Sequence, residues 1–199
     1  MAKRIDDDVV RRARAGDQEA WGQLYAAHAG RLVTWLRSLP TGDAAADSED
    51  LAAEAWLTAA RRISEFSGDA SDFAGWLFGI ARHLVWNQRR RTGRRGTVPH
   101  AVDLAEPGMW GTSEDTAAVN AVGMDMTRRL LALLPTREAE VVACLDVVGL
   151  DVGTVATALG ISRTAVRVAH HRALTKLRKL LPADEPADTD TGATAEPSI

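Results

Sequence analysis

The 199-residue chain has a single cysteine, a single tyrosine and no long apolar run. A single cysteine excludes a disulfide framework, and this absence fits a protein of the reducing cytoplasm. Because Cys144 stands in an apolar stretch of sequence, we expect it to be packed in the core. No window reaches the roughly 18 consecutive apolar residues of a membrane span. The start of the chain is too acidic and too poor in apolar residues for a signal peptide. These absences predict a cytoplasmic protein without membrane insertion.

Acidic residues are missing from two segments, although the formal net charge of the whole chain is −3. Residues 73–102 contain six arginines and no acid, and residues 160–181 contain six Lys and Arg side chains and no acid. The acids gather instead in residues 41–72 and in the tail, residues 182–199. This segregation predicts two separate surfaces for an anionic partner such as nucleic acid.

Strand-type alternation is nearly absent, and apolar residues recur at the three- and four-residue spacing of helices. We expect an all-α protein with an N-terminal helical bundle in 1–95 and a C-terminal helical domain in 117–181, with most tryptophans packed in the core. Between them, residues 96–116 keep no apolar period, contain no Lys or Arg, and indicate a flexible linker. The acidic tail 182–199 has almost no large apolar side chain and is predicted to be disordered. The helices expected in the bundle cover residues 5–15, 21–39, 47–63 and 73–91.

The strongest local pattern is a helix-turn-helix between residues 152 and 169. Gly160 permits the left-handed backbone of a tight turn, and Ser162 is a suitable cap for the helix that follows. That second helix would present polar and basic side chains to the major groove of DNA. A helical hairpin with a solvated basic face is the alternative, which the coincidence of turn glycine, cap and acid-free face disfavours. The predicted DNA contacts are Ser162, Arg163, Thr164, Arg167, His171 and Arg172.

A second candidate nucleic-acid surface lies on the helix expected over residues 73–91, which is capped by Ser71 or Asp72 and whose C-terminal half is basic. Trp86 stands among arginines there, so its indole could stack on an exposed base while guanidinium groups hold phosphates. Core packing of Trp86 is an equal alternative. The polar loop 64–72 before this helix contains Phe66 and could either receive a flipped base or form a plain surface turn.

Asp50 and Glu54 lie one turn apart on the helix expected over 47–63. Paired carboxylates can serve as general acid and base, but neither a nucleophile nor a metal-ligand cluster accompanies them. The neighbouring His170 and His171 point about 100° apart on a helix and cannot readily share a metal ion. We therefore expect no enzyme, metal or cofactor, and interpret the acidic pair as a docking face for a basic protein surface.

Five segments of the chain, taken in their order along the sequence, resemble RNA polymerase sigma factors of the extracytoplasmic-function group. The resemblance covers about residues 5–95 and 125–181, and it implies two helical domains joined by a flexible linker. It also implies an alternative sigma factor that binds core RNA polymerase, recognises the −35 and −10 promoter elements and promotes DNA melting. The five segments are LYAAHAGRL (24–32), EDLAAEAWLTA (49–59), FAGWLFGIARHLVWNQRRR (73–91), LPTREAEVV (134–142) and LGISRTAVR (159–167).

The resemblance implies roles for individual residues. Asp50, Leu51 and Glu54 would contact the clamp helices of the largest polymerase subunit, and the C-terminal domain the flap of the second largest. The helix that begins at Ser162 would read the −35 element. An anti-sigma factor is implied as a further partner. The loop and the basic helix would capture and melt the −10 element through Ser64, Phe66, Ser67, Trp76, Arg82, His83, Trp86, Asn87, Arg89 and Arg90.

Two other functions remain open at this point. A stand-alone helix-turn-helix regulator would bind a specific duplex without polymerase, but it leaves the acidic helix and the Trp-bearing basic helix unexplained. A hydrolase that uses Asp50 and Glu54 is the less favoured alternative. A separate hypothesis is that the acidic tail 182–199 shields the basic C-terminal helix.

Overall fold

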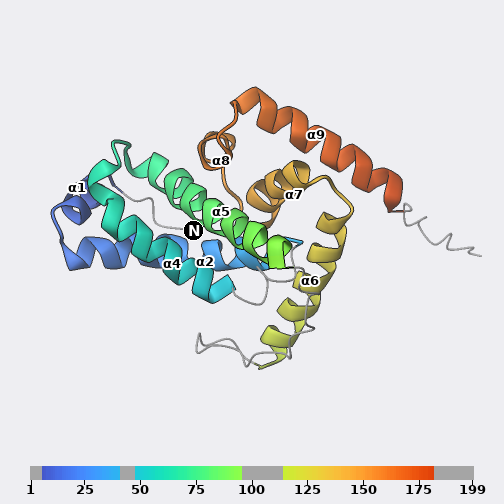
Figure 1. Ribbon diagram of the computed structural model, residues 1–199, viewed down its shortest axis with the longest axis horizontal. Helices are drawn as coiled ribbons and strands as arrows, with labels where there is room; N and C mark the ends of the chain where they lie inside the picture. The colour runs from blue at the N-terminus through green and yellow to red at the C-terminus, as the bar shows by residue number, and fades with distance from the viewer. Residues whose placement is uncertain (1–5, 41–47, 96–113, 182–199) are drawn as a thin grey trace, which may run out of the picture.

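The computed structural model describes residues 6–40, 48–95 and 114–181, with the side chains of 92–95 and 114–121 left out. Every regular element in these ranges is helical, and they contain no strand (Figure 1). The all-α prediction is therefore confirmed. The acidic tail and most of the predicted linker lie outside the described residues, and residues 114–116 of that linker already belong to a helix. Among the described helices, none combines the length and hydropathy that a membrane crossing requires.

The N-terminal bundle consists of α1 (Asp7–Arg14), α2 (Gln18–Ser38), α4 (Ser48–Arg62) and α5 (Ala70–Arg95), with a 3-10 turn, η1 (Ile63–Glu65), after α4. The predicted cap of α5 was wrong: Asp69, rather than Ser71 or Asp72, caps this helix. Its carboxylate accepts hydrogen bonds from the Ser71 hydroxyl and from the backbone N–H groups of Asp72 and Ser71, which lower the pKa of Asp69. The helix consequently begins three residues earlier than its apolar pattern indicates.

Aromatic side chains fill the core of this bundle. Trp35, Phe73 and Phe78 are fully buried, and Trp56 is buried beside Phe73 with its ring centroid 6.2 Å away. Trp21 and Trp76 pack against the edge of the same core, whereas Trp86 is 45% exposed. The prediction that most tryptophans pack in the core holds for those that the structure describes, with Trp86 as the exception.

The C-terminal helices are α6 (Glu114–Ala132), α7 (Thr136–Val142), α8 (Val152–Leu159) and α9 (Arg163–Leu180). A π-helical turn, η2 (Ala143–Val147), continues α7 and contains the fully buried Cys144, whose thiol pKa is raised by burial. Cys144 is therefore a packed core residue, as predicted. Both the N-terminal and the C-terminal helices contribute to one continuous cluster of buried apolar residues.

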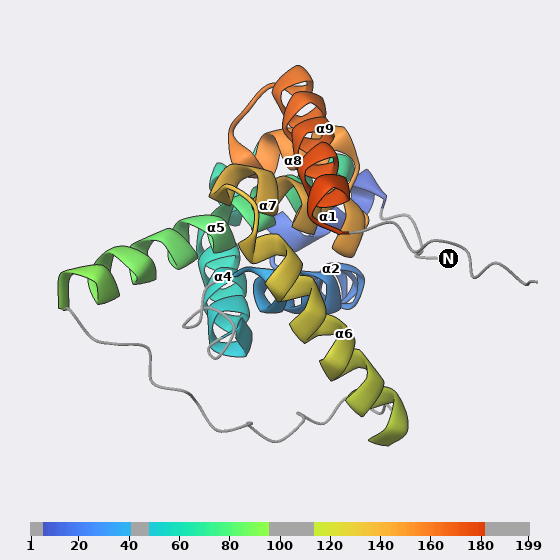
Figure 2. The ribbon, with the colours of Figure 1, turned by 90° about the vertical axis from the view of Figure 1, so that its right-hand side faces the viewer.

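The two groups of helices pack closely against each other. α5 makes its most extensive helix contact with α8, and α2 packs against α6 and η2 (Figures 1 and 2). The guanidinium of Arg31, on α2, donates hydrogen bonds to the backbone carbonyls of Val148, at 3.0 Å, and Gly149, at 2.8 Å. This closed arrangement decides which of the candidate functional residues face solvent.

Candidate nucleic-acid interface

The helix-turn-helix forms as its sequence predicts. Gly160 has a φ of 64°, and the N–H of Ile161 donates to the carbonyl of Ala156, which closes the turn after α8. The Ser162 hydroxyl accepts a hydrogen bond from the N–H of Ala165 and so caps α9. The inner side of α9 is held by the buried Val166, Ala169 and Ala173. The predicted contacts Ser162, Arg163, Thr164, Arg167, His171 and Arg172 are all exposed.

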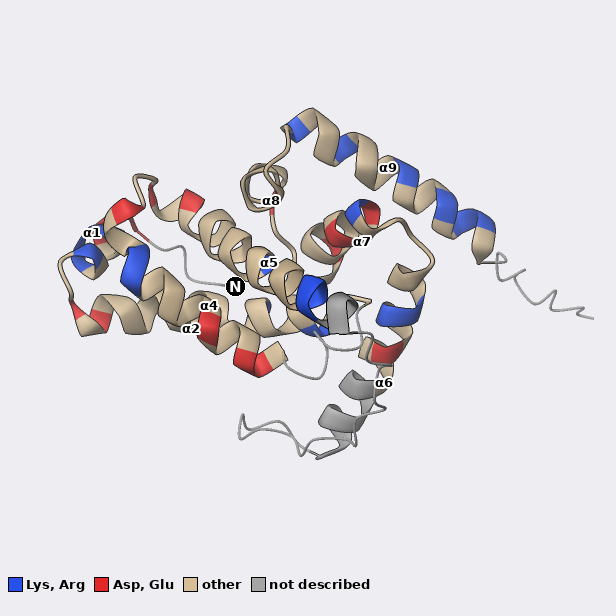
Figure 3. Ribbon diagram, in the orientation of Figure 1, with Lys and Arg blue, Asp and Glu red and all other residues tan. Residues whose placement is uncertain are grey.

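Basic side chains continue along α9 beyond the predicted contacts. Figure 3 shows Lys and Arg spaced over its whole length, and the helix contains no Asp or Glu. A shallow hollow near its C-terminal half is lined by His171, Arg172, Thr175, Lys176 and Lys179. Lys176 and Lys179 were missing from the predicted contacts, although the acid-free run in the sequence contains them. The positive face of α9 therefore extends well past the turn of the motif.

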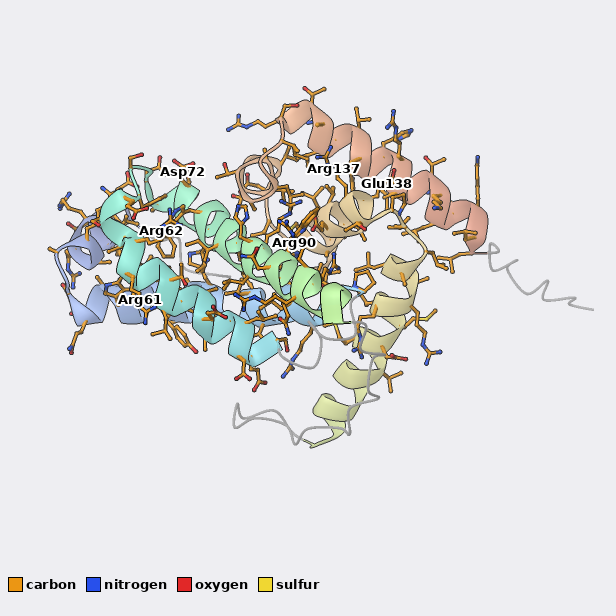
Figure 4. The ribbon with its side chains drawn as sticks, viewed as in Figure 1. Arg61, Arg62, Asp72, Arg90, Arg137 and Glu138 are labelled. Atoms are coloured by element: carbon orange, nitrogen blue, oxygen red, sulfur yellow. The ribbon has the colours of Figure 1, made fainter. Side chains whose placement is uncertain are left out.

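The basic half of α5 has two faces with different surroundings. One is open to solvent and exposes the predicted contacts His83, Asn87 and Arg90, the last of which is labelled in Figure 4. The other includes Arg82 and Trp86 and faces α7. There the Arg82 guanidinium lies 5.3 Å from the centroid of the Trp86 ring, as a cation–π pair.

A buried carboxylate on α7, Glu140, occupies this second face. Arg82 Nε donates to Glu140 Oε2 at 3.1 Å, and Trp86 Nε1 donates to Glu140 Oε1 at 3.3 Å. Burial lowers the pKa of Arg89, and the charge of Glu140 acts in the opposite direction. Glu140 was not among the predicted site residues, although an acid within the apolar run AEVVACL indicated that its carboxylate would need a partner.

The loop before α5 packs against α1, which helps to cover its one aromatic side chain, Phe66. Phe66 is only 7% exposed, and it stacks on Trp76 with the ring centroids 4.9 Å apart. The Arg14 guanidinium lies over the Phe66 ring, 5.3 Å from its centroid, and donates to the Gly68 carbonyl at 3.0 Å. The expectation that Phe66 faces a DNA base is therefore not met in this conformation, because α1 and Trp76 cover the ring. Ser64 and Ser67 are exposed.

The acidic face of α4 is open to solvent. Asp50 and Glu54 are exposed, as expected for a docking surface. Leu51 is 5% exposed and belongs to the core, so its side chain supports the helix from within and does not form part of this surface. Leu57 was not among the predicted contacts, but it is 58% exposed and follows Glu54 by three residues on the same face.

Comparison with known proteins identifies the family. The Sigma-70 region 2 model matches residues 24–95, and the Sigma-70 region 4 model matches residues 130–179. The sigma factor SigD of Mycobacterium tuberculosis, of the extracytoplasmic-function group, is 30% identical over 174 residues, which cover 86% of this chain and 82% of SigD. The chain belongs to the extracytoplasmic-function group of RNA polymerase sigma factors. A further relative in this group, BldN of Streptomyces coelicolor, is 32% identical over 180 residues, or 89% of this chain and 66% of BldN.

Solved sigma-factor structures have the same fold. CnrH, determined in complex with the cytosolic domain of CnrY, has a TM-score of 0.64 and 26% identity, covering 90% of this chain and 99% of CnrH. RpoE from Bartonella quintana, in complex with the anti-sigma factor NepR, also has a TM-score of 0.64, at 20% identity over 84% of this chain and 99% of RpoE, and supports the fold alone. The chain is therefore an alternative sigma factor, which acts in promoter recognition and transcription initiation.

Proposed function

We propose that this sigma factor docks on core RNA polymerase through the exposed acidic face of α4 and directs the enzyme to promoters with two DNA-binding surfaces. Asp50 and Glu54 carry the charge of the docking face, and Leu57 adds an apolar contact one turn further on. The expected partner on the polymerase is the clamp-helix region of the largest subunit. The C-terminal domain takes a second site at the flap of the second largest subunit.

The −35 contact is assigned to α9. Its exposed arginines provide phosphate contacts that position the helix, while a few side chains at its N-terminal end contact base edges. A good bidentate contact to the correct base contributes about 1–3 kcal/mol of discrimination. The observation that supports the proposal most strongly is the acid-free helix α9, which Ser162 caps and on which all six predicted contacts are exposed. This helix lies within the residues that match the Sigma-70 region 4 model.

The −10 contact is assigned to α5 and the loop that precedes it. Melting unstacks bases at a cost of a few kcal/mol each, so the open strand must be held by stacking and by phosphate contacts. His83, Asn87 and Arg90 are exposed and available for this, and Trp86 with Arg82 supplies an indole next to a guanidinium. Ser64 and Ser67 lie on the exposed side of the loop.

The protein catalyses no reaction in this proposal; the polymerase does the chemistry, in the cytoplasm. A protein that binds and inhibits the sigma factor, an anti-sigma factor, is the further partner that we propose, since CnrH was solved in complex with the cytosolic domain of CnrY. Such a protein would compete for the same exposed face of α4.

Transcription in vitro with purified core polymerase and a promoter library tests the proposal. We expect the chain to bind core and to select a defined set of start sites. Replacing Asp50 by Asn together with Glu54 by Gln should weaken core binding at least tenfold, because both docking charges are lost. Glu19→Gln, which removes an exposed carboxylate on α2, is the matched control and should bind normally. Specific duplex binding without core, with unchanged transcript starts, would instead support a stand-alone regulator.

A further inference from the structure

We infer that Glu140 occupies the place of a DNA phosphate on α5 and keeps the Arg82–Trp86 face of the −10 contact surface closed until core polymerase separates the two halves of the protein. The inference rests on the proposed role of α5 in binding the −10 strand. It concerns a regulatory contact within the chain, between residues that lie 54 and 58 positions apart.

The burial of Glu140 requires the contact. The residue is 4% exposed and lies between the fully buried Ala139 and Val141. A carboxylate removed from water to this extent is strongly destabilising unless it is paired and hydrogen-bonded. Both of its oxygens are satisfied by α5, one by Arg82 and one by Trp86. Opening the two halves would therefore either hydrate Glu140 or leave it unpaired.

The groups that hold Glu140 are those proposed to hold DNA. A guanidinium binds a carboxylate and a phosphate with the same planar set of donors, so the Arg82 Nε that donates to Glu140 is not available to a phosphate. Glu140 also engages the indole N–H of Trp86, and Arg82 covers part of the Trp86 ring. In the closed form the Trp86 indole N–H and the Arg82 Nε are therefore bound to Glu140 and are not available to an unstacked base or its phosphate.

Close packing of α5 against α8 holds the two halves of the protein together around this contact. A Cβ atom at Gly75, on α5, would lie 2.8 Å from Thr157 Cβ and 3.0 Å from the Thr154 carbonyl oxygen of α8. Only glycine permits this approach of the two helices. Gly79 continues the contact one turn later, where its Cβ position lies 3.9 Å from Ala158 Cα. Together with the Arg31 hydrogen bonds to Val148 and Gly149, these contacts fix α7 and α8 on the N-terminal bundle.

The closure affects one DNA-binding surface and leaves the other free. α9 lies on the side of α7 and α8 that faces away from α5 (Figures 1 and 2), and its Lys and Arg side chains are exposed. The closed protein can therefore bind a −35 duplex while the Arg82–Trp86 face of its −10 surface stays closed. Two promoter elements about two turns apart are separated by roughly 70 Å. With only α7 and α8 between α5 and α9, the closed form cannot span that distance, so it must open when both elements are bound.

Binding of single-stranded DNA to the free full-length chain tests the inference. Glu140→Gln keeps the shape of the side chain but removes its charge, and it should bind a fluorescent −10-strand oligonucleotide about tenfold more tightly than the wild type. Such a gain follows if the open form rises from a few per cent to a major fraction of the molecules, because apparent affinity scales with the competent fraction. Affinity for a −35 duplex should not change. Glu138→Gln, at a half-buried position two residues earlier on the same helix, is the matched control and should behave as the wild type (Figure 4).

Two further variants act on the contact from the α8 side. Gly75→Leu should force α8 away from α5 with Glu140 intact, and should give the same gain in strand binding. Gly79→Cys combined with Ala158→Cys should lock the closed form under oxidising conditions, abolish promoter opening by the holoenzyme, and recover on reduction. If Glu140→Gln and Gly75→Leu lower the melting temperature without any gain in strand binding, Glu140 is only structural and the inference is wrong. Failure of the wild type to direct transcription with core would instead refute the proposed function.

Discussion

Acid should destabilise this sigma factor through the buried His28. Its imidazole is 7% exposed, packs 5.7 Å from the ring of Phe73, and has no hydrogen-bond partner on either nitrogen. Burial, with a smaller contribution from the charge of Arg31, lowers the pKa of His28 from 6.5 to about 4. The native state therefore keeps His28 neutral over a range in which the unfolded chain binds a proton.

The sign and size of the effect follow from linkage. Between pH 6.5 and pH 4 the unfolded state binds more protons than the native state, so stability is complete above pH 6.5 and is lost as the pH falls. Each pKa unit corresponds to about 1.4 kcal/mol, so the loss from His28 at pH 4 amounts to about 3 kcal/mol.

Urea unfolding followed by tryptophan fluorescence at pH 7, 6, 5 and 4 measures this loss. His28→Leu removes the titrating group and should flatten the pH dependence by about 3 kcal/mol relative to the wild type. His83→Gln replaces an exposed histidine and should leave the dependence as it is. Carboxylates titrate equally in all three proteins and cancel in the comparison. Parallel curves for the wild type and His28→Leu would refute the assigned cause.

Other predictions concern the DNA-binding helix and its turn. Arg167→Ala should reduce the discrimination between bases at one position of the −35 duplex by about 1–3 kcal/mol. Lys179→Ala should weaken the affinity for all duplexes alike and reduce the slope of log affinity against log salt concentration by about one. Fluorescence anisotropy measures both effects. Gly160→Ala should lower the free energy of unfolding by about 1–2 kcal/mol in urea titrations, because a Cβ is strained at a φ of 64°. If the acidic tail shields α9, removing residues 182–199 should strengthen duplex binding at low salt but not at high salt, and an unchanged affinity would dismiss the shield.

The helix-turn-helix could be predicted from the sequence because its determinants are local. Gly160 at the turn and Ser162 at the cap act within a few residues, and their roles follow from backbone conformation and hydrogen bonding alone. The start of α5 was less certain because Asp69, Ser71 and Asp72 all offer capping oxygens. Only the folded geometry selects among them.

The surroundings of α5 and its loop could not be predicted in the same way. The sequence indicates that Arg82 and Trp86 share a face, but what covers that face comes from α7, more than 50 residues later. Phe66 stands in a polar loop and looks exposed, yet Arg14 and Trp76 cover it from two other helices. Such contacts between distant segments leave no periodic signal in the sequence.

The shared core across the two halves has a consequence for the intact polypeptide. Leu131 and Leu134 of the C-terminal half and Trp35 and Leu36 of the N-terminal half belong to one buried cluster, so neither half is enclosed without the other. A protease cut between residues 96 and 113 should leave two fragments that co-migrate on a sizing column as one particle. Only a larger partner that offers each fragment a replacement surface should pull them apart.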